Sequence, residues 1–429
     1  SRTTTTLPLL PLLRLDEPSI HSSVHLSHRS TITTPKRILS SYVHRPSFTS
    51  TPSTMKSTML CFRLLEVLWF CFLLMGRALV EGCACADTMD DIIAQIGNPE
   101  IPVCGGRTIE FSGEPIDVTG MKFRLFSIDC NGNDDESVEP AVLVGNRHFS
   151  TNEGSTHNIT LSNVTFVQKD VDAQNCIHTK GTGGILDVLG CAFEGISTNV
   201  SLAGRFNRRI GVRQDSMDPR PLLLLPFRTY QKGRAILNEQ GTVNVRDCSF
   251  YNHTNKNYGA AILNYANMTI KNSTFSGNQA ILNYGGAIGN SGAMEIKSSN
   301  FTGNQAIVGG AIYATDSLSK TTIGATMFVG NIASWYGGAI RCVQSASCEI
   351  GYSTFKENVA EDGYGGAIGA YGSGLLVVSY NDFDANKDYL FFNQSGAGAV
   401  HLARKSNCTM QGNNFTDNTS GSSGSEITI

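Results

Sequence analysis

The sequence is poor in the features that mark membrane-spanning, helical-repeat and metal-binding proteins. Its apolar run at 67–75 (VLWFCFLLM) is far shorter than the ~20 residues that a bilayer helix needs, so no membrane span is expected. None of the nine histidines has partners at the spacing of metal ligands, and no metal site is predicted. The repeat units of residues 141–429 are full of Gly, Asn, Ser and Thr, and their apolar residues come in short alternating clusters, which argues against a helical repeat.

The first 82 residues have the composition of segments that lie outside a folded domain. Residues 1–54 are rich in Ser, Thr, Pro and Arg without apolar periodicity, so we expect a disordered leader or a gene-model artefact. Met55 is the first methionine, and Lys56, the apolar run and then small residues follow it, which predicts a signal peptide at 55–82. Cleavage after Gly82 is favoured over cleavage after Ala86. The mature protein is therefore expected to be secreted or displayed on the cell surface.

Removal of this leader changes the charge of the protein. The whole chain has 33 basic and 36 acidic residues, and without residues 1–82 these become 24 and 32, a net charge of −8. Such a charge argues against nucleic acid or an anionic membrane as a partner. Ten of the twelve cysteines remain, and an even number in an exported chain favours disulfides.

Asn-x-Ser/Thr sequons are frequent, which favours a secretory glycoprotein. The sequons are at Asn158, Asn163, Asn199, Asn252, Asn267, Asn272, Asn300, Asn393, Asn407, Asn414 and Asn418.

A tandem repeat dominates the rest of the chain. From residue 233 onward each unit has a small-small-aliphatic step such as GGAI at 285–288, and from Phe275 onward it ends in Phe-x-x-Asn. From Phe250 onward, successive repeat phenylalanines are 25 to 32 residues apart, and self-similarity at such a period predicts a solenoid. Inside each unit, short clusters of β-branched and aromatic residues alternate between turn formers, as strands do. We therefore predict an all-β fold, a right-handed single-stranded parallel β-helix with three strands per coil and coils ~4.8 Å apart.

The N-terminal part of the fold is expected to close this β-helix. The segment 87–96 (DTMDDIIAQI) has the pattern of a short capping helix with an acidic first turn. The segments RTIEF, EPIDV and MKFRLFSI that follow are predicted as the three strands of the first coil. The organisation is then a cap and first coil at 83–140 and β-helix repeats at 141–429.

Equivalent residues of stacked coils should form ladders inside the β-helix. A phenylalanine ladder is predicted from Phe275, Phe301, Phe328, Phe355, Phe383 and Phe415. An asparagine ladder is predicted from Asn278, Asn304, Asn331, Asn358, Asn386 and Asn418. The asparagine amides are expected to bond between coils, with these residues in the left-handed backbone conformation that Asn tolerates.

The combination of GGA[ILV] with FxxN over residues 141–429 resembles the repeat of the chlamydial polymorphic outer-membrane proteins. More broadly, it resembles the right-handed β-helix superfamily of pectate lyases. The resemblance implies the fold, and the bacterial family implies an adhesive role at a surface.

Catalytic motifs of β-helix enzymes are not found, and the cluster that comes nearest is Asp382, Asp384, Lys387 and Asp388, with His401 and Arg404 about one coil later. Asp384 lies inside the repeat's own turn, so a solvated turn is favoured over a catalytic site. The acidic segment 129–136 resembles a calcium loop, but its Gly is misplaced and Pro140 stands where a bidentate Glu is expected, so an acidic surface loop is favoured and no cofactor is predicted.

Two functions therefore stay open. The favoured one is a non-catalytic adhesive protein that binds extracellular glycans or surface proteins. The alternative is a calcium-dependent polysaccharide lyase or epimerase, for which an Asp, Arg and Lys cluster across three adjacent coils would be needed.

Further expectations concern the cysteines, one irregular segment and the end of the sequence. Cys342 and Cys348 are predicted to form a disulfide within one coil, and Cys104 and Cys130 are predicted to pair near the cap. Cys191 and Cys248 should stack inside neighbouring coils, as a pair or as thiols. The basic segment 205–233 lacks both repeat motifs, so we expect a retained intron or a loop without a coil of its own, with a functional lid as the alternative. Since Ile427 occupies the position that opens another coil, the sequence is expected to be truncated.

Overall fold

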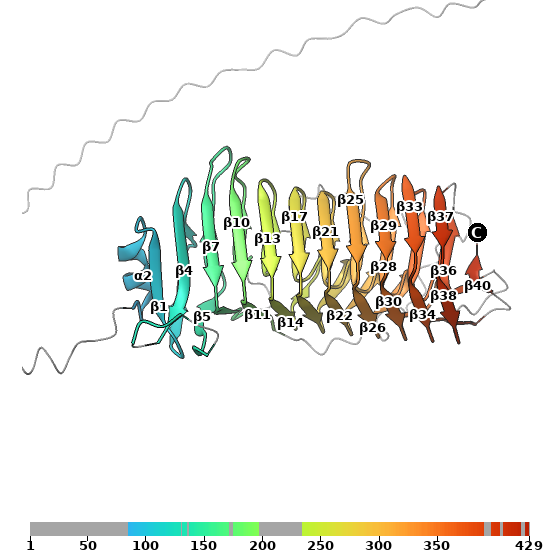
Figure 1. Cartoon of the computed structure of the whole chain (residues 1–429), viewed down its shortest axis with the longest axis horizontal. Helices are drawn as coiled ribbons and strands as arrows, with labels where there is room; N and C mark the ends of the chain where they lie inside the picture. The colour runs from blue at the N-terminus through green and yellow to red at the C-terminus, as the bar shows by residue number, and fades with distance from the viewer. Residues whose placement is uncertain are drawn as a thin grey trace, which may run out of the picture. The chain divides into compact units, whose positions relative to one another are not determined.

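A computed structural model describes residues 85–129, 131–134, 137–170, 175–196, 234–389, 396–403, 406–421 and 425–428. The expectations for 1–54, for the signal peptide at 55–82, for 205–233, for Cys130 and for Arg404 lie outside these residues. The described chain forms a parallel β-solenoid of about ten turns with one short helix near its start, which confirms the predicted all-β solenoid with an N-terminal helix. Figure 1 shows the strands following one another along the solenoid axis from β1 to β40.

Three sheets of eleven parallel strands run the length of the solenoid. Sheet 1 contains β1 (Glu100–Cys104), β4 (Lys122–Ile128), β7 (Asn158–Ser162), β10 (Ile185–Leu189), β13 (Thr242–Arg246), β17 (Asn267–Lys271), β21 (Ala293–Lys297), β25 (Lys320–Gly324), β29 (Ser347–Gly351), β33 (Leu375–Ser379) and β37 (Cys408–Gln411). Sheet 2 contains β2 (Thr108–Phe111), β5 (Ala141–Gly145), β8 (Val164–Val167), β11 (Ala192–Glu194), β14 (Ser249–Tyr251), β18 (Thr274–Ser276), β22 (Asn300–Thr302), β26 (Met327–Val329), β30 (Thr354–Lys356), β34 (Asp382–Asp384) and β38 (Asn414–Thr416). Sheet 3 contains β3 (Ile116–Asp117), β6 (Phe149–Ser150), β9 (Ile177–Thr179), β12 (Ile236–Asn238), β16 (Ile262–Asn264), β20 (Ile288–Asn290), β24 (Ile312–Ala314), β28 (Ile340–Val343), β32 (Ile368–Tyr371), β36 (Ala397–Ala403) and β40 (Ser425–Thr428).

A fourth sheet, which the sequence did not predict, joins the later coils. Sheet 4 contains β15 (Thr254–Asn255), β19 (Gln279–Tyr284), β23 (Gln305–Val308), β27 (Ile332–Tyr336), β31 (Val359–Ala360), β35 (Lys387–Asp388) and β39 (Thr419–Ser420). Four of these strands are only two residues long, which is too short for an alternating pattern to be recognised in the sequence. The later coils therefore have four strands each, where three were predicted.

The first coil begins earlier than predicted. Strand β1 pairs with β4 from Glu100↔Arg124 to Cys104↔Ile128, so MKFRLFSI opens the second coil and EIPVC opens the first. Pro102 interrupts the apolar pattern of β1, and proline is tolerated there because β1 is the edge strand of sheet 1.

The helix α2 (Met89–Gln95) packs on the open end of this coil. Its N-cap residue Thr88 and Asp91 form a reciprocal capping box, in which each backbone N–H donates to the other side chain at 3.2 Å. Ile92 is fully buried in the core cluster. Within the described residues, no helix is both long and apolar enough to cross a membrane.

A disulfide joins Cys85 to Cys104, with 5.1 Å between their Cα atoms, so the predicted pairing of Cys104 with Cys130 is wrong. The backbone N–H of Cys104 donates to the Ala86 carbonyl at 2.9 Å, which brings Cys85 beside β1. The prediction failed because β1 itself had not been recognised.

The core consists of side chains stacked in register. The rings of Phe166, Phe193, Phe250, Phe275, Phe301, Phe328, Phe355, Phe383 and Phe415 stack in one column with centroids 4.7–5.0 Å apart. Each fully buried phenylalanine contributes roughly 1.5–3 kcal/mol through the apolar area removed from water. Ile288, Ile312, Ile340 and Ile368 form a second column across sheet 3.

The FxxN asparagines bond from coil to coil. In each pair, the side-chain and backbone N–H groups of one asparagine donate to the Oδ1 atom of the next, at 2.9–3.1 Å. The left-handed residue is the one before each asparagine, for example Glu357 at φ 54° and Ala385 at φ 52°, so the expected backbone conformation of the asparagines is wrong. The turn needs the asparagine side chain directed inward, and the preceding residue reverses the chain.

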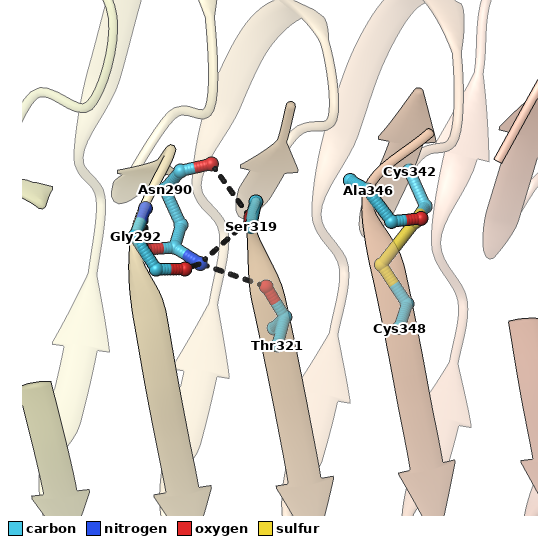
Figure 2. The surroundings of a disulfide bond; sticks show 7 residues. All are labelled: Asn290, Gly292, Ser319, Thr321, Cys342, Ala346 and Cys348. Carbon is cyan, nitrogen blue, oxygen red and sulfur yellow. Dashed lines mark hydrogen bonds between the residues drawn. A yellow bond between two sulfur atoms is a disulfide. The ribbon is translucent and has the colours of Figure 1, made fainter. Parts of the chain in front are cut away.

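A second polar column lies between sheets 3 and 1 and ends at a disulfide (Figure 2). Asn238 Nδ2 donates to Asn264 Oδ1, and Asn264 Nδ2 donates to Asn290 Oδ1, both at 2.8 Å. Asn290 Nδ2 then donates to the Thr321 hydroxyl at 2.9 Å. In the next coil Thr321 is aligned with Cys348, which is bonded to Cys342, so the predicted Cys342–Cys348 disulfide is confirmed.

The strands on the two sides of the 197–233 segment pair directly. Strand β10 pairs with β13 and β11 with β14, with Phe193 opposite Phe250. The predicted adjacency of these coils is therefore present. Cys191 and Cys248 are buried free thiols in these neighbouring coils, and the Cys191 N–H donates to Cys248 Sγ at 3.3 Å.

Candidate functional site: an aromatic face around Arg341

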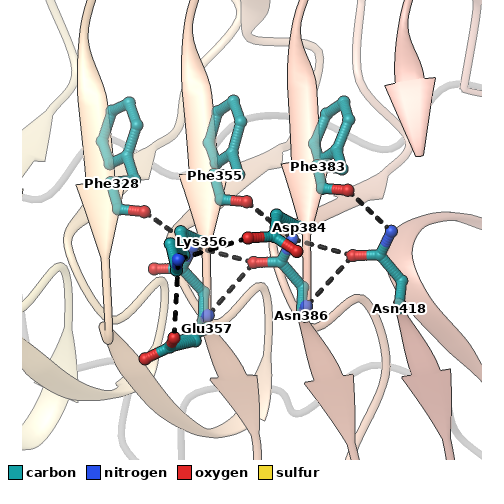
Figure 3. A network of polar contacts seen from close by, with 9 residues as sticks. Phe328, Phe355, Lys356, Glu357, Phe383, Asp384, Asn386 and Asn418 are labelled. Carbon is teal, nitrogen blue, oxygen red and sulfur yellow. Dashed lines mark hydrogen bonds and ion pairs between the residues drawn. The ribbon is translucent and has the colours of Figure 1, made fainter. Parts of the chain in front are cut away.

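The four polar residues suggested by the sequence lie on two different sheets. Asp382 and Asp384 project outward from β34 in sheet 2, and Lys387 and Asp388 belong to β35 in sheet 4. The Asp384 carboxylate lies 3.4 Å from the Lys356 Nζ atom of the preceding coil, beside the asparagine ladder (Figure 3). Asp384 thus takes part in a surface ion pair between coils.

Asp388 has a structural role, because its side chain is buried and hydrogen-bonded. Its side chain is buried, and Oδ1 accepts hydrogen bonds from the Ser420 hydroxyl at 2.6 Å and the Gly421 N–H at 3.1 Å. His401 lies on β36 in sheet 3, where its ring stacks on Tyr364 at 4.5 Å. Asp388 and His401 both lie near Tyr364, whereas Asp382 and Asp384 lie on sheet 2, so the suggested residues do not form one cluster.

In the acidic loop at 129–134, amides of the loop itself donate hydrogen bonds to the Asp129 carboxylate. Asp129 Oδ1 accepts the backbone N–H groups of Asn131 at 2.8 Å and Asn133 at 2.9 Å. These hydrogen bonds, with those from Asn133 the strongest, lower the pKa of Asp129. The arrangement is a local turn stabilised by amides.

A different set of side chains gathers on the outer side of sheet 3. We call it the aromatic face. It consists of Tyr258, Tyr284, Tyr313, Trp335, Tyr336, Arg341, Tyr364, Tyr371 and His401.

Two positions of the repeat supply most of this face. A tyrosine precedes the small-small-aliphatic step in NYGAAI, NYGGAI, WYGGAI and GYGGAI, which places Tyr258, Tyr284, Tyr336 and Tyr364 at the end of sheet 4 or just after it. The second position is the first outward residue of sheet 3, where Tyr313, Arg341, Gly369 and His401 are aligned in consecutive strands.

The corner between these two positions brings them into contact. Gly337 has φ 63°, and a Cβ atom there would lie 2.1 Å from the Ile340 carbonyl oxygen, so glycine is required. The sharp turn directs the preceding tyrosine beside the outward residues of sheet 3. The ring centroids of Tyr284 and Tyr313 are accordingly 4.8 Å apart.

Arg341 lies within the aromatic face. Its guanidinium carbon is 4.6 Å from the Tyr336 ring centroid and 5.8 Å from the Tyr371 ring centroid. Contacts of this kind between a guanidinium and aromatic faces are favourable, and more so when water is excluded. Only 4% of Arg341 is exposed, and its Nη1 atom has no hydrogen-bond partner in the described part of the chain.

Burial has the largest effect on the pKa values of Arg341 and its neighbour His401. Burial lowers the pKa of Arg341 to about 10, which leaves the guanidinium charged at neutral pH. Burial, and secondly the Arg341 charge, lower the pKa of His401 to about 4, so this imidazole is neutral at pH 7. Arg341 and His401 therefore differ in charge although they line the same hollow.

That hollow opens on the aromatic face and is lined by Tyr336, Arg341, Tyr364, Tyr371, His401 and Ala403. Gly369 makes room for the guanidinium, since a Cβ atom there would lie 2.8 Å from Nη1. The hollow can offer ring faces to an apolar surface and charge-assisted hydrogen bonds to an anionic group.

Sequence reasoning missed the aromatic face because it searched for acidic clusters. One signal was present, namely the tyrosine before four of the small-small-aliphatic steps. Arg341 had no such signal, because it occurs once and at a position where other coils have Tyr313, Gly369 or His401.

Comparisons with known proteins bear on the repeat. No curated protein sequence matches the chain. Among solved structures, PfbA, a surface adhesin of Streptococcus pneumoniae, is similar with 14% identity and a TM-score of 0.34, over 77% of this chain and 81% of that chain. Residues 298–315, which include FTGN and GGAI, match the Chlamydia polymorphic membrane protein repeat. The chain is thus a parallel β-solenoid that carries a repeat similar to that of the Chlamydia polymorphic membrane proteins.

Proposed function

We propose that this protein is a non-catalytic adhesive β-solenoid that binds extracellular glycan chains along its aromatic face. The observation that carries the proposal is the gathering of tyrosines from successive coils on one face, with neighbouring ring centroids 4.8–5.8 Å apart. Aromatic rings combine a flat apolar surface with a polar edge, which suits the C–H faces and hydroxyl groups of sugars. Because the coils repeat along one axis, such a surface suits a chain-like ligand better than a compact one.

A non-catalytic role is supported by the positions of the acidic residues. Asp384 is paired with Lys356, and Asp388 is buried with Ser420 and Gly421. A lyase or epimerase would need such groups together beside a bound sugar.

A location outside the cell is supported by three features. The expected signal peptide is one, and the similarity to a repeat of polymorphic membrane proteins is another. The third is the presence of the disulfides Cys85–Cys104 and Cys342–Cys348, which persist in oxidising compartments.

The proposal is tested by measuring retention of the full chain on an array of neutral and acidic polysaccharides. Tyr284→Ala and Tyr336→Ala, at partly exposed positions, are expected to weaken binding about tenfold each, equivalent to ~1.4 kcal/mol. Tyr352→Ala is the matched control, because Tyr352 is 71% exposed and stacks on Tyr380, away from the aromatic face. Release of unsaturated sugar products would favour the lyase alternative, and retention that is equal in all variants would contradict the assignment of the face.

A further inference from the structure

The Arg341 guanidinium is buried with an unusual set of neighbours. A buried charge is costly unless it is paired, and removing a partner from such a group costs several kcal/mol in proteins generally. Arg341 is 4% exposed, yet Nη1 has no acceptor among the residues that the structure describes.

The groups that face Arg341 are aromatic. Its pKa is influenced, after burial, by Tyr336, Tyr313, Tyr371 and Tyr284, and within the described residues no carboxylate forms an ion pair with it. The acidic residues after β31 do not change this, because the pKa of Glu361 is raised by burial and by Asp362, with no influence from Arg341. The remaining neighbour, His401, is neutral at pH 7.

The arrangement of donors on arginine favours a planar anion. The guanidinium carbon lies 4.6 Å from the Tyr336 ring centroid and 5.8 Å from the Tyr371 ring centroid, so aromatic rings and not acceptor groups surround it. A carboxylate presents two coplanar oxygens that match two parallel N–H groups of arginine.

A second polar atom lies at the same hollow. His401 Nδ1 is buried and has no hydrogen-bond partner in the described residues, and its ring lies flat against Tyr364. A neutral imidazole can donate or accept one hydrogen bond at this atom, which suits a sugar hydroxyl next to a carboxylate.

We propose that the hollow around Arg341 binds the carboxylate of an acidic sugar, with the guanidinium as the anion-binding group and His401 beside it. This inference rests on the proposed glycan-binding function and names the class of glycan, a polymer that contains uronate residues. The tyrosines supply affinity for sugar rings in general, and Arg341 supplies the preference for an acidic one.

The experiment uses the full chain with hyaluronan, alginate and polygalacturonate, each beside its carboxyl-reduced form, together with dextran sulfate. We expect at least one polyuronate to bind tenfold or more tightly than its reduced form. This preference should be lost in Arg341→Gln and weakened in Arg341→Lys, which keeps the charge without the two parallel donors. Lys356→Gln is the control, since it removes a surface cation that is paired with Asp384. The reduced ligands test the same contact in the unmodified protein if Arg341→Gln does not fold.

The possible results separate the two proposals. Equal binding of acidic and reduced glycans, or a preference that persists in Arg341→Gln, would overturn the inference and leave the glycan-binding function standing. Dextran sulfate binding that equals the best polyuronate and depends on Arg341 would overturn the choice of carboxylate. Failure to retain any of these polysaccharides, neutral forms included, would overturn the proposed function itself.

Discussion

Asn331 Nδ2 donates to Asn358 Oδ1 at 2.9 Å, and the same oxygen accepts the backbone N–H of Asn331 at 3.0 Å. Asn331 Nδ2 also donates to the Phe301 carbonyl at 2.9 Å, so one side chain connects three consecutive coils. Each of these groups is buried, and the ladder repeats at every FxxN turn from Asn278 to Asn418.

Asn331→Ala should lower the free energy of unfolding by roughly 2–4 kcal/mol, because it leaves buried groups of Phe301 and Asn304 without partners. Urea unfolding followed by circular dichroism measures the change. Lys320→Ala is the control, since Lys320 is exposed, and its effect should stay within about 0.5 kcal/mol. Similar effects of the two substitutions would contradict a structural role for the ladder.

Phe355→Ala should cost roughly 3–5 kcal/mol, because the fully buried ring is stacked between Phe328 and Phe383. Lys356→Ala, one residue later, should change stability by no more than about 0.5 kcal/mol, since its side chain is half exposed and its ion pairs lie at the surface. Thermal or urea unfolding of both variants distinguishes the inward from the outward side of β30. A small loss of stability in Phe355→Ala would mean that Phe355 points outward, so that the inward and outward sides of β30 had been assigned the wrong way round.

The double variant Cys342→Ala, Cys348→Ala should be less stable by roughly 2 kcal/mol, the value expected for a short disulfide-closed loop. A reducing agent should then destabilise the variant less than the parent protein. Cys248→Ser is the control because Cys248 is a free thiol, and Ser273 occupies the equivalent position in the next coil. Equal stability of the double variant and the parent would show that this bond does not restrain the unfolded chain.

Stability should fall as the pH is lowered from 6.5 to 4, partly because of His253. Burial lowers the pKa of His253 to about 4, whereas the unfolded value is 6.5. The unfolded chain therefore takes up a proton in this range while the folded protein does not, which costs about 3 kcal/mol near and below pH 4. His253 occupies the asparagine position of its coil, and its N–H donates to Asn278 Oδ1.

His253→Asn should reduce this pH dependence, because asparagine does not titrate and can donate to the Phe193 carbonyl as His253 does. Free energies of unfolding at pH 7 and pH 4.5 provide the comparison. His148 and His401, whose pKa values burial also lowers to about 4, remain as further sources of acid sensitivity. An unchanged difference between the two pH values would contradict the assignment to His253.

In a secreted glycosylated form, the Asn267 sequon should carry a glycan, because this side chain is exposed at the start of β17. The Asn418 sequon should stay unmodified, since Asn418 Nδ2 donates to the Phe383 carbonyl at 2.9 Å and Oδ1 accepts from Asn386. Peptide mapping by mass spectrometry of protein from a eukaryotic host measures both sites. A glycan at Asn418 would mean that the last part of the ladder is open.

The solenoid could be predicted because its core residues recur at fixed positions and must therefore stack. Phe328, Phe355 and Phe383 are such residues, and the Cys342–Cys348 pair followed from its place within one unit. The partner of Cys104 could not be predicted, because it depends on an edge strand whose pattern Pro102 interrupts.

The aromatic face was harder to predict than the core. Outward positions are not restricted by packing, so Arg341 follows Tyr313 and precedes Gly369 without a rule in the repeat. Its contact with Tyr336 also depends on the turn at Gly337, which a linear pattern of residues does not describe.

The direction of the bonds between coils has a mechanical consequence. Backbone hydrogen bonds, the asparagine ladders and the phenylalanine stack all join one coil to the next, along the solenoid axis. Tension applied between the two ends would load these boundaries in series, so coils should peel away one at a time instead of rupturing together. The Cys342–Cys348 bond lies inside one coil and would only shorten the length released when that coil opens. Such stepwise extension would let a molecule anchored at one end and bound at the other dissipate force gradually.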